Sequence, residues 1–187
     1  MSRKDILPTT IIILTGILLY IGACKILGYS ILSDDAQKLI PYNKPVHTGH
    51  EGEIMPSIDI QLSDSVTYLN TSSILKGRPT VLFYFSPYCP FCQSQIHEIM
   101  ENIRQLKTID FFLITPYSYP EMKAFYKKNE LKKFTNITVG IDYKQKFSEY
   151  FKAQGIPYLA IYNSEKRLNN AFLGEVKHQQ LKLECKK

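Results

Sequence analysis

Two cysteines three positions apart are the residues of this chain whose types and spacing could do chemistry. Cys89 and Cys92 lie at the end of the stretch FYFSPYCPFC, residues 83–92, in a chain that has four cysteines. This spacing has three common uses: half of a zinc site, attachment of a c-type haem, or a dithiol that cycles with a disulfide. Each use requires different neighbouring residues, so the rest of the sequence decides between them.

The neighbours of the pair argue against a metal or a haem. A structural zinc site needs four ligands, usually from two such pairs. The chain has one pair, Cys24 and Cys185 lie far from it, and His97 lies well along the helix expected after it. Haem attachment requires a histidine directly after the second cysteine, and Gln93 stands there. We therefore expect no metal and no cofactor, and favour a redox dithiol over two buried structural cysteines.

Cys89 falls where a buried strand gives way to a helix. The apolar run 80–85 predicts a central strand, and after Pro90 apolar residues recur at helical spacing as far as Leu106. Free N–H groups and the dipole at a helix N-terminus stabilise an anion, which favours the Cys89 thiolate, and proline suits the first helical position. Cys92 lies one turn later, within reach of a disulfide. We therefore predict that Cys89 is the nucleophile and Cys92 the resolving thiol.

The remaining patterns predict an α/β domain over residues 55–187 with one mixed sheet flanked by helices. Apolar residues that alternate with polar ones indicate two short strands, which would form an N-terminal β-hairpin extension. The expected strands are 58–62, 66–69, 80–85, 109–114, 137–141, 158–162 and 168–173, and the expected helices are 90–106, 119–128, 145–152 and a terminal helix ending near residue 183.

The N-terminal segment is apolar enough to enter a membrane. Residues 6–24 carry no charge, and as a helix these 19 residues would span about 28 Å, close to the hydrocarbon thickness of a bilayer. Arg3 and Lys4 favour keeping residues 1–5 in the cytoplasm. We therefore expect one transmembrane helix within residues 6–32 and an extracytoplasmic domain, in a compartment where disulfides persist.

The same segment has a second interpretation, a lipoprotein signal. Residues 21–24 (IGAC) resemble a bacterial lipobox, in which case Cys24 would be lipidated after cleavage. The apolar run is long for a cleaved signal and apolar residues continue past the cysteine, which favours an uncleaved anchor. Both interpretations leave the domain tethered to a membrane.

Residues 33–54 predict a linker between the anchor and the domain, because they are polar, contain glycine and show no sustained periodicity. Their side chains include possible metal ligands, His47, His50, Glu51 and Glu53. A flexible linker does not hold ligands in place, so we expect no metal site there.

The charge of the chain does not indicate a nucleic-acid partner. The formal net charge is +6, but the lysines are scattered and the aromatic residues follow no stacking pattern. We therefore expect a solvated basic surface.

Pro157 stands directly before a buried strand, where a proline cannot donate to the ladder of hydrogen bonds. Together with the cysteine pair, residues 155–157 (GIP) resemble the thioredoxin superfamily, in which a cis-proline opens a strand that faces the dithiol. The resemblance implies that Pro157 is cis, that the Ile156 backbone pairs with a bound substrate peptide, and that Tyr88 and Pro90 also contact the substrate. A plain turn proline is the alternative.

The residues ahead of the cysteine pair narrow the resemblance to the TlpA-like thiol-disulfide oxidoreductases. Residues 55–62 (MPSIDIQL) and 75–82 (LKGRPTVL) look like the entry hairpin and the LKGK approach of these membrane-tethered proteins, and the match runs from about Gly52 to the end. The resemblance implies a thioredoxin-like fold in the periplasm, on the bacterial cytoplasmic membrane. It also implies protein disulfides or dithiols as substrates and a membrane thiol carrier as electron donor or acceptor.

Several positions depart from the pattern of this family. Tyr88 replaces a tryptophan before the first cysteine, and Phe83 occupies the place of a buried acid that assists proton transfer to the second thiol. Gln95 stands where many relatives have a glutamate. The Pro-Phe pair at 90–91 is also uncommon, and the residues between the cysteines help to set the reduction potential. Without either acid, we expect Cys92 to lose its proton through water or substrate.

We predict a membrane-tethered, extracytoplasmic thiol-disulfide oxidoreductase that reduces disulfides of secreted proteins or apocytochromes. Reduction is preferred by analogy with the family, and a disulfide-forming oxidase of the same fold is the alternative. A peroxiredoxin is less favoured, because Ser86 fits that pattern but Leu82 stands where its proline should be. A copper chaperone using Cys89, Cys92 and His97 is also less favoured, because related copper carriers place three residues between their cysteines.

Overall fold

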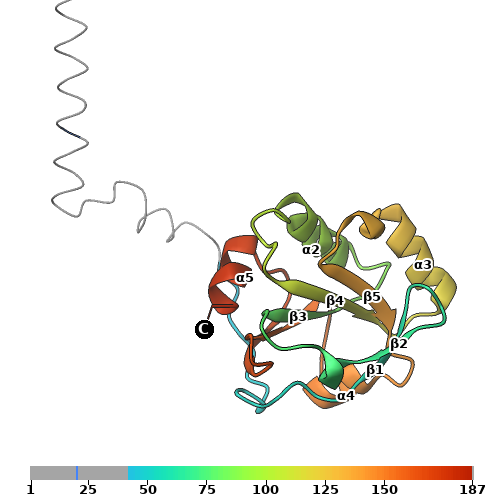
Figure 1. Cartoon of the computed structure of the whole chain (residues 1–187), viewed down its shortest axis with the longest axis horizontal. Helices are drawn as coiled ribbons and strands as arrows, with labels where there is room; N and C mark the ends of the chain where they lie inside the picture. Colours follow the sequence, from blue (N-terminus) through green and yellow to red (C-terminus); the bar gives the residue numbers. More distant parts are fainter. Residues whose placement is uncertain (1–19, 21–41, 187) are drawn as a thin grey trace, which may run out of the picture. The chain divides into compact units, whose positions relative to one another are not determined.

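The chain was analysed as a computed structural model that describes Tyr20 and residues 42–186. From residue 42 on, these form a seven-stranded mixed sheet with helices on both faces (Figure 1), so the predicted α/β architecture is confirmed. Apart from Tyr20, the anchor predicted over 6–32 lies outside the described residues, as does Cys24. Among the described residues, no helix combines the length and the apolar character needed to cross a membrane.

The strand order in the sheet is β2-β1-β5-β4-β3-β6-β7. Its centre is parallel, β3 beside β4 and β4 beside β5, whereas β6 pairs antiparallel with β3 and β7 pairs antiparallel with β6. The predicted N-terminal hairpin is present and continues the sheet antiparallel to β5. The strands are β1 Asp59–Leu62, β2 Tyr68–Asn70, β3 Thr80–Tyr84, β4 Asp110–Thr115, β5 Ile137–Ile141, β6 Tyr158–Tyr162 and β7 Leu168–Leu173.

The predicted helices are present, but the first is shorter than its periodicity suggested. That helix, α2, ends at Glu101 rather than near Leu106, because Asn102 caps it and its side-chain amide donates to the Glu98 carbonyl (2.9 Å). Leu106 is still buried, although it lies in the turns that follow. The helices are α2 Pro90–Glu101, α3 Tyr119–Lys128, α4 Lys146–Phe151 and α5 His178–Glu184, with short 3-10 turns η2 Thr71–Ser73 and η3 Leu131–Lys133.

Alternation along β3 divides the core into two layers. Val81 and Phe83 belong to the layer covered by α2, α3 and α5, whereas Leu82 and Tyr84 belong to the layer covered by α4. Successive side chains of a strand point to opposite faces, so a strand covered on both sides is apolar at every position. This explains the unbroken apolar run before the cysteine pair.

The linker predicted over 33–54 is wrong for the part that the structure describes, because residues 42–54 pack on the domain. The Val46 N–H donates to the Ala171 carbonyl (2.8 Å), and residues 52 and 53 exchange hydrogen bonds with Leu168. Since β7 is an edge strand, it has free backbone groups that this segment satisfies. The domain therefore begins at about residue 42 rather than 55.

His50 has a structural role in this segment. Its ring stacks on the Tyr150 ring with 4.1 Å between centroids, and its Nδ1 lies 2.9 Å from the Glu53 carboxylate. The same carboxylate accepts a hydrogen bond from the Tyr150 hydroxyl (2.8 Å). The side chains considered above as possible metal ligands thus include two that attach the segment to α4.

Candidate active site

Cys89 is the N-cap residue of α2, and Pro90 is the first residue of the helix. The Cys89 N–H donates to the Ser86 carbonyl (3.2 Å), and the Cys89 carbonyl accepts from the N–H of Gln93 (3.0 Å). The side chain of Cys89 is partly exposed. It therefore lies at the positive end of the helix dipole, where the sequence placed it, and a substrate can reach it.

Cys92 is one turn into α2 and has no exposed surface. Both cysteines are free thiols, and Cys92 packs in the same apolar layer as Phe83 and Phe85. Burial raises the pKa of Cys92 to about 12; the adjacent Cys89 thiol adds to the increase and a backbone hydrogen bond from Ser86 opposes it. Cys92 is therefore a neutral, shielded thiol at physiological pH.

Phe83 and Gln95, which stand where the family that the chain resembles has acidic residues, have other roles in this fold. Phe83 is fully buried in the middle of β3, with its ring centroid 5.7 Å from that of Phe85. Gln95 is also fully buried, and it accepts from the Val176 N–H (2.6 Å) and donates to the Val176 carbonyl (3.1 Å). A glutamate carboxylate could not donate the second bond, so the amide suits the attachment of α2 to the segment between β7 and α5.

The predicted proline loop lies beside the first cysteine. The Ile156–Pro157 peptide bond is cis, and the Cys89 Sγ lies 3.9 Å from the Ile156 carbonyl oxygen. The Pro157 carbonyl is occupied, because it accepts from the N–H of Gly174 (2.8 Å). Residues 67 positions apart in the sequence thus meet at the thiol.

Tyr88 has a partner that sequence reasoning missed. The residue is 68% exposed, and its hydroxyl donates to Glu121 at the start of α3 (2.9 Å). The other oxygen of Glu121 accepts from the Ser118 N–H (2.9 Å), and the Tyr117 ring lies edge-on to the Tyr88 ring at 5.6 Å. The spacing Ser-x-x-Glu at 118–121 is a capping-box pattern, a signal that could have located Glu121 at a helix start.

The hydrogen bond between Tyr88 and Glu121 shifts the pKa of each group in the direction that keeps the bond intact. It raises the pKa of the Tyr88 hydroxyl, and hydrogen bonds from Ser118 and then from Tyr88 lower the pKa of Glu121. At neutral pH the tyrosine is therefore a donor and the glutamate a charged acceptor. The predicted site residues other than Cys24 are thus gathered around Cys89, with Glu121 added to them.

Comparison with known proteins places the chain in a family. Residues 50–184 match the Redoxin family. The methylamine utilization protein MauD of Methylophilus methylotrophus is 29% identical over 85 residues, which cover 46% of this chain and 40% of MauD. An uncharacterized protein of Haemophilus influenzae is 28% identical over 138 residues, covering 69% of this chain and 85% of that protein.

Solved structures share the fold at low sequence identity. A secreted disulfide oxidoreductase of Mycobacterium tuberculosis has a TM-score of 0.55 at 18% identity, covering 68% of this chain and 92% of that one. StoA from Bacillus subtilis has a TM-score of 0.54 at 16% identity, covering 69% of this chain and 96% of StoA. The predicted thioredoxin-like fold is confirmed. The chain therefore belongs to the Redoxin family, as a thiol-disulfide oxidoreductase of the thioredoxin superfamily.

Proposed function

We propose that this oxidoreductase is tethered to the bacterial cytoplasmic membrane, faces the periplasm, and reduces disulfides of secreted proteins or apocytochromes. Cys89 is the nucleophile and Cys92 the resolving thiol. The observation that carries the proposal is the asymmetry of the pair: a partly exposed thiol at a helix N-terminus stands next to a fully buried one.

The reaction proceeds through a mixed disulfide. The Cys89 thiolate attacks one sulfur of the substrate disulfide, a Cys89–substrate S–S bond forms, and the other substrate sulfur leaves as a thiolate. The Cys92 thiol then loses its proton and attacks the Cys89 sulfur, which releases the second substrate thiol and forms the Cys89–Cys92 disulfide. Two electrons from a membrane dithiol carrier restore the reduced pair.

The loop beside Cys89 offers a place for the substrate backbone. Within the described residues, the Ile156 N–H has no acceptor, and the Ile156 carbonyl already lies next to the reactive sulfur. An extended peptide can pair with such free groups as an added strand does. Tyr88 and Pro90, which flank Cys89 in the chain, are exposed. They would contact the residues around the substrate disulfide, as would Pro157 from the loop.

The burial of Cys92 supports reduction over oxidation. In an oxidase, a substrate thiolate attacks the Cys89 sulfur and Cys92 must leave as a thiolate. A leaving thiol with a pKa of about 12 departs slowly, which disfavours transfer of the disulfide to a substrate. The membrane tether rests on the uncharged run 6–24, and the periplasmic location on the positive residues before it.

Removal of the resolving thiol should trap substrates. In the Cys92→Ser variant the mixed disulfide cannot be resolved, so we expect Cys89-linked adducts that non-reducing electrophoresis of acid-quenched cells detects in the membrane fraction. Cys185→Ser, which removes the other described cysteine and leaves the pair intact, should form no lasting adducts. Adducts that persist when Cys89 is also replaced by serine, or that contain only cytoplasmic proteins, would contradict the proposed nucleophile or location.

The reduction potential of the cysteine pair decides whether the protein reduces or oxidises its substrates. We expect a value near that of thioredoxin, about −270 mV, because a Cys92 thiol that stays protonated does not stabilise the reduced pair as a thiolate does in strong oxidants. Equilibration of the full chain in redox buffers, with the fraction of free thiol read by alkylation, measures it. A value near −120 mV would instead identify an oxidase.

The resolving step should accelerate with pH. Attack requires the Cys92 thiolate, and burial holds the pKa of Cys92 at about 12, so its thiolate fraction should rise about tenfold per pH unit between pH 7 and 9. A single-turnover experiment that follows substrate release after mixed-disulfide formation measures this rate, and Cys92→Ser isolates the first step. A rate that levels off below pH 8 would mean that a base near Cys92 assists the reaction.

Tyr88→Phe tests whether the bond to Glu121 holds the ring for substrate contact. We expect kcat/KM for a protein disulfide to fall about fivefold, or about 1 kcal/mol, because the ring loses a hydrogen bond to a charged group. The rate with a small aromatic disulfide should change less than twofold. Glu121→Gln should give a smaller loss of kcat/KM. Tyr68→Phe, which removes the hydroxyl of an exposed tyrosine on β2, serves as the matched control. Equal loss for both substrates would refute a role in protein recognition.

A further inference from the structure

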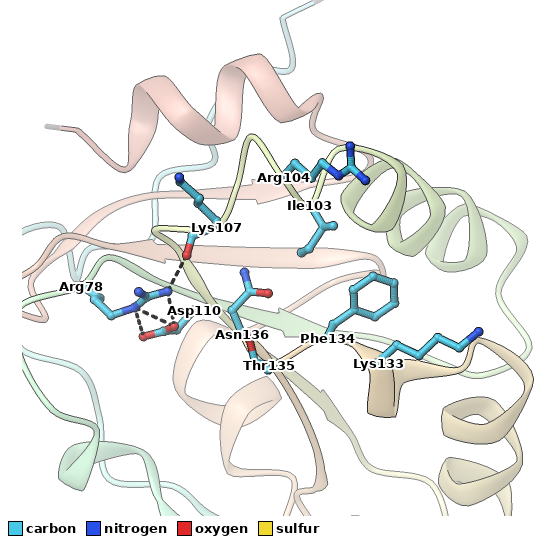
Figure 2. Close-up of a pocket in the computed structure, with 9 residues that line it drawn as sticks. All are labelled: Arg78, Ile103, Arg104, Lys107, Asp110, Lys133, Phe134, Thr135 and Asn136. Atoms are coloured by element: carbon cyan, nitrogen blue, oxygen red, sulfur yellow. Dashed lines mark hydrogen bonds and ion pairs between the residues drawn. The ribbon is translucent and has the colours of Figure 1, made fainter.

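A hollow of about 650 Å³ lies at the end of α2 remote from the cysteine pair (Figure 2). It is formed by residues that follow α2, by the first residue of β4, and by residues just before β3 and β5. The cysteine pair follows the other end of β3, so the hollow and the dithiol lie at opposite ends of the central strands. The lining residues are Arg78, Ile103, Arg104, Lys107, Asp110, Lys133, Phe134, Thr135 and Asn136.

The lining of the hollow is strongly cationic. It includes four basic side chains and one carboxylate, Asp110. That carboxylate is already neutralised, because both of its oxygens accept from the Arg78 guanidinium at 2.9 and 3.0 Å. The same guanidinium donates to the Lys107 carbonyl (2.7 Å), so Arg78 is held in place on two sides.

The other three basic side chains leave an excess of positive charge. Lys133, the last residue of η3, pairs with Glu130, the residue before η3 (2.5 Å). Arg104 and Lys107 are exposed and form no ion pair with any acidic group of the described residues. Like charges gathered around a concave surface repel one another and attract a counter-ion, and arginine suits the geometry of an oxyanion.

One side of the hollow is apolar. Ile103 and Phe134 are partly buried, and Figure 2 shows their side chains between those of Arg104 and Lys133, with Asn136 between Phe134 and Arg78. The wall between these groups is rigid, because the Asn136 amide donates to the Ile109 carbonyl (2.8 Å) and the Leu106 carbonyl (3.3 Å). An apolar wall with cations beside it fits a ligand that has both an anionic and an apolar part.

We propose that this hollow binds a phosphate-bearing amphiphile. The phosphate would lie at Arg104 and Lys107, and the apolar part would cover Ile103 and Phe134. A membrane phospholipid and a free phosphorylated metabolite share this chemistry. The site uses neither cysteine, so the proposal is independent of the redox function.

Calorimetric titration of the full chain in neutral detergent tests the proposal, with hexyl phosphate as the amphiphile and inorganic phosphate as the plain anion. Wild-type protein should bind hexyl phosphate at least tenfold more tightly than inorganic phosphate. The double variant Arg104→Gln, Lys107→Gln should lose at least tenfold in affinity. The double variant Lys128→Gln, Lys144→Gln removes the same charge from exposed lysines outside the hollow and should stay within twofold of wild type.

Equal loss in the two double variants would show general charge attraction and overturn the site. Equal affinity for hexyl phosphate and inorganic phosphate would overturn the amphiphile, as would no binding of either. Repeating the wild-type titration with phosphatidylglycerol in the micelles separates the two sources. A phospholipid site would be occupied and weaken hexyl phosphate binding, whereas a site for a free metabolite would leave it unchanged.

Discussion

Burial of the Cys92 thiol on the inner face of α2 is the constraint on which the active site depends. The thiol lies in an apolar layer with Phe83 and Phe85, and burial raises its pKa to about 12. Cys89, at the partly exposed N-cap, is consequently the thiol open to solvent, and in the proposed mechanism Cys92 acts only after a mixed disulfide has formed. The same burial disfavours the departure of Cys92 as a thiolate, which is the physical ground for the proposed direction of electron flow.

That burial requires α2 to be held firmly against the sheet. Its inner face contributes Ile96 and Ile99 to the core, and Gln95 attaches it through two hydrogen bonds to Val176. Around the exposed thiol, three separate parts of the chain supply contacts: the residues before α2, the proline loop before β6 and the start of α3. The site therefore forms where these three parts of the chain meet, and the positions of Tyr88 and Ile156 depend on tertiary packing as much as on local sequence.

The two ends of α2 differ in chemical character. The cysteine end is surrounded by exposed aromatic and proline residues, Tyr88, Pro90 and Phe91, which suit apolar stretches of a protein substrate. The other end opens on a hollow rimmed by Arg104, Lys107 and other cations. The net charge of +6, which composition alone indicated to be a diffuse basic surface, is thus partly concentrated around a concave site.

The sequence by itself determined the strand–cysteine–helix unit, since apolar runs, helical spacing and the proline after Cys89 are local signals, and nearly every strand and helix followed from them. The resemblance to the thioredoxin superfamily added the prediction that Pro157 is cis and that its loop faces the cysteine pair. Only the tertiary structure decided that residues 42–54 cover the edge of β7, that Glu121 holds Tyr88, and that basic residues from several elements line one hollow. These contacts join positions far apart in the chain. Periodicity describes which side of its own element a residue faces, but not which distant residue it meets there.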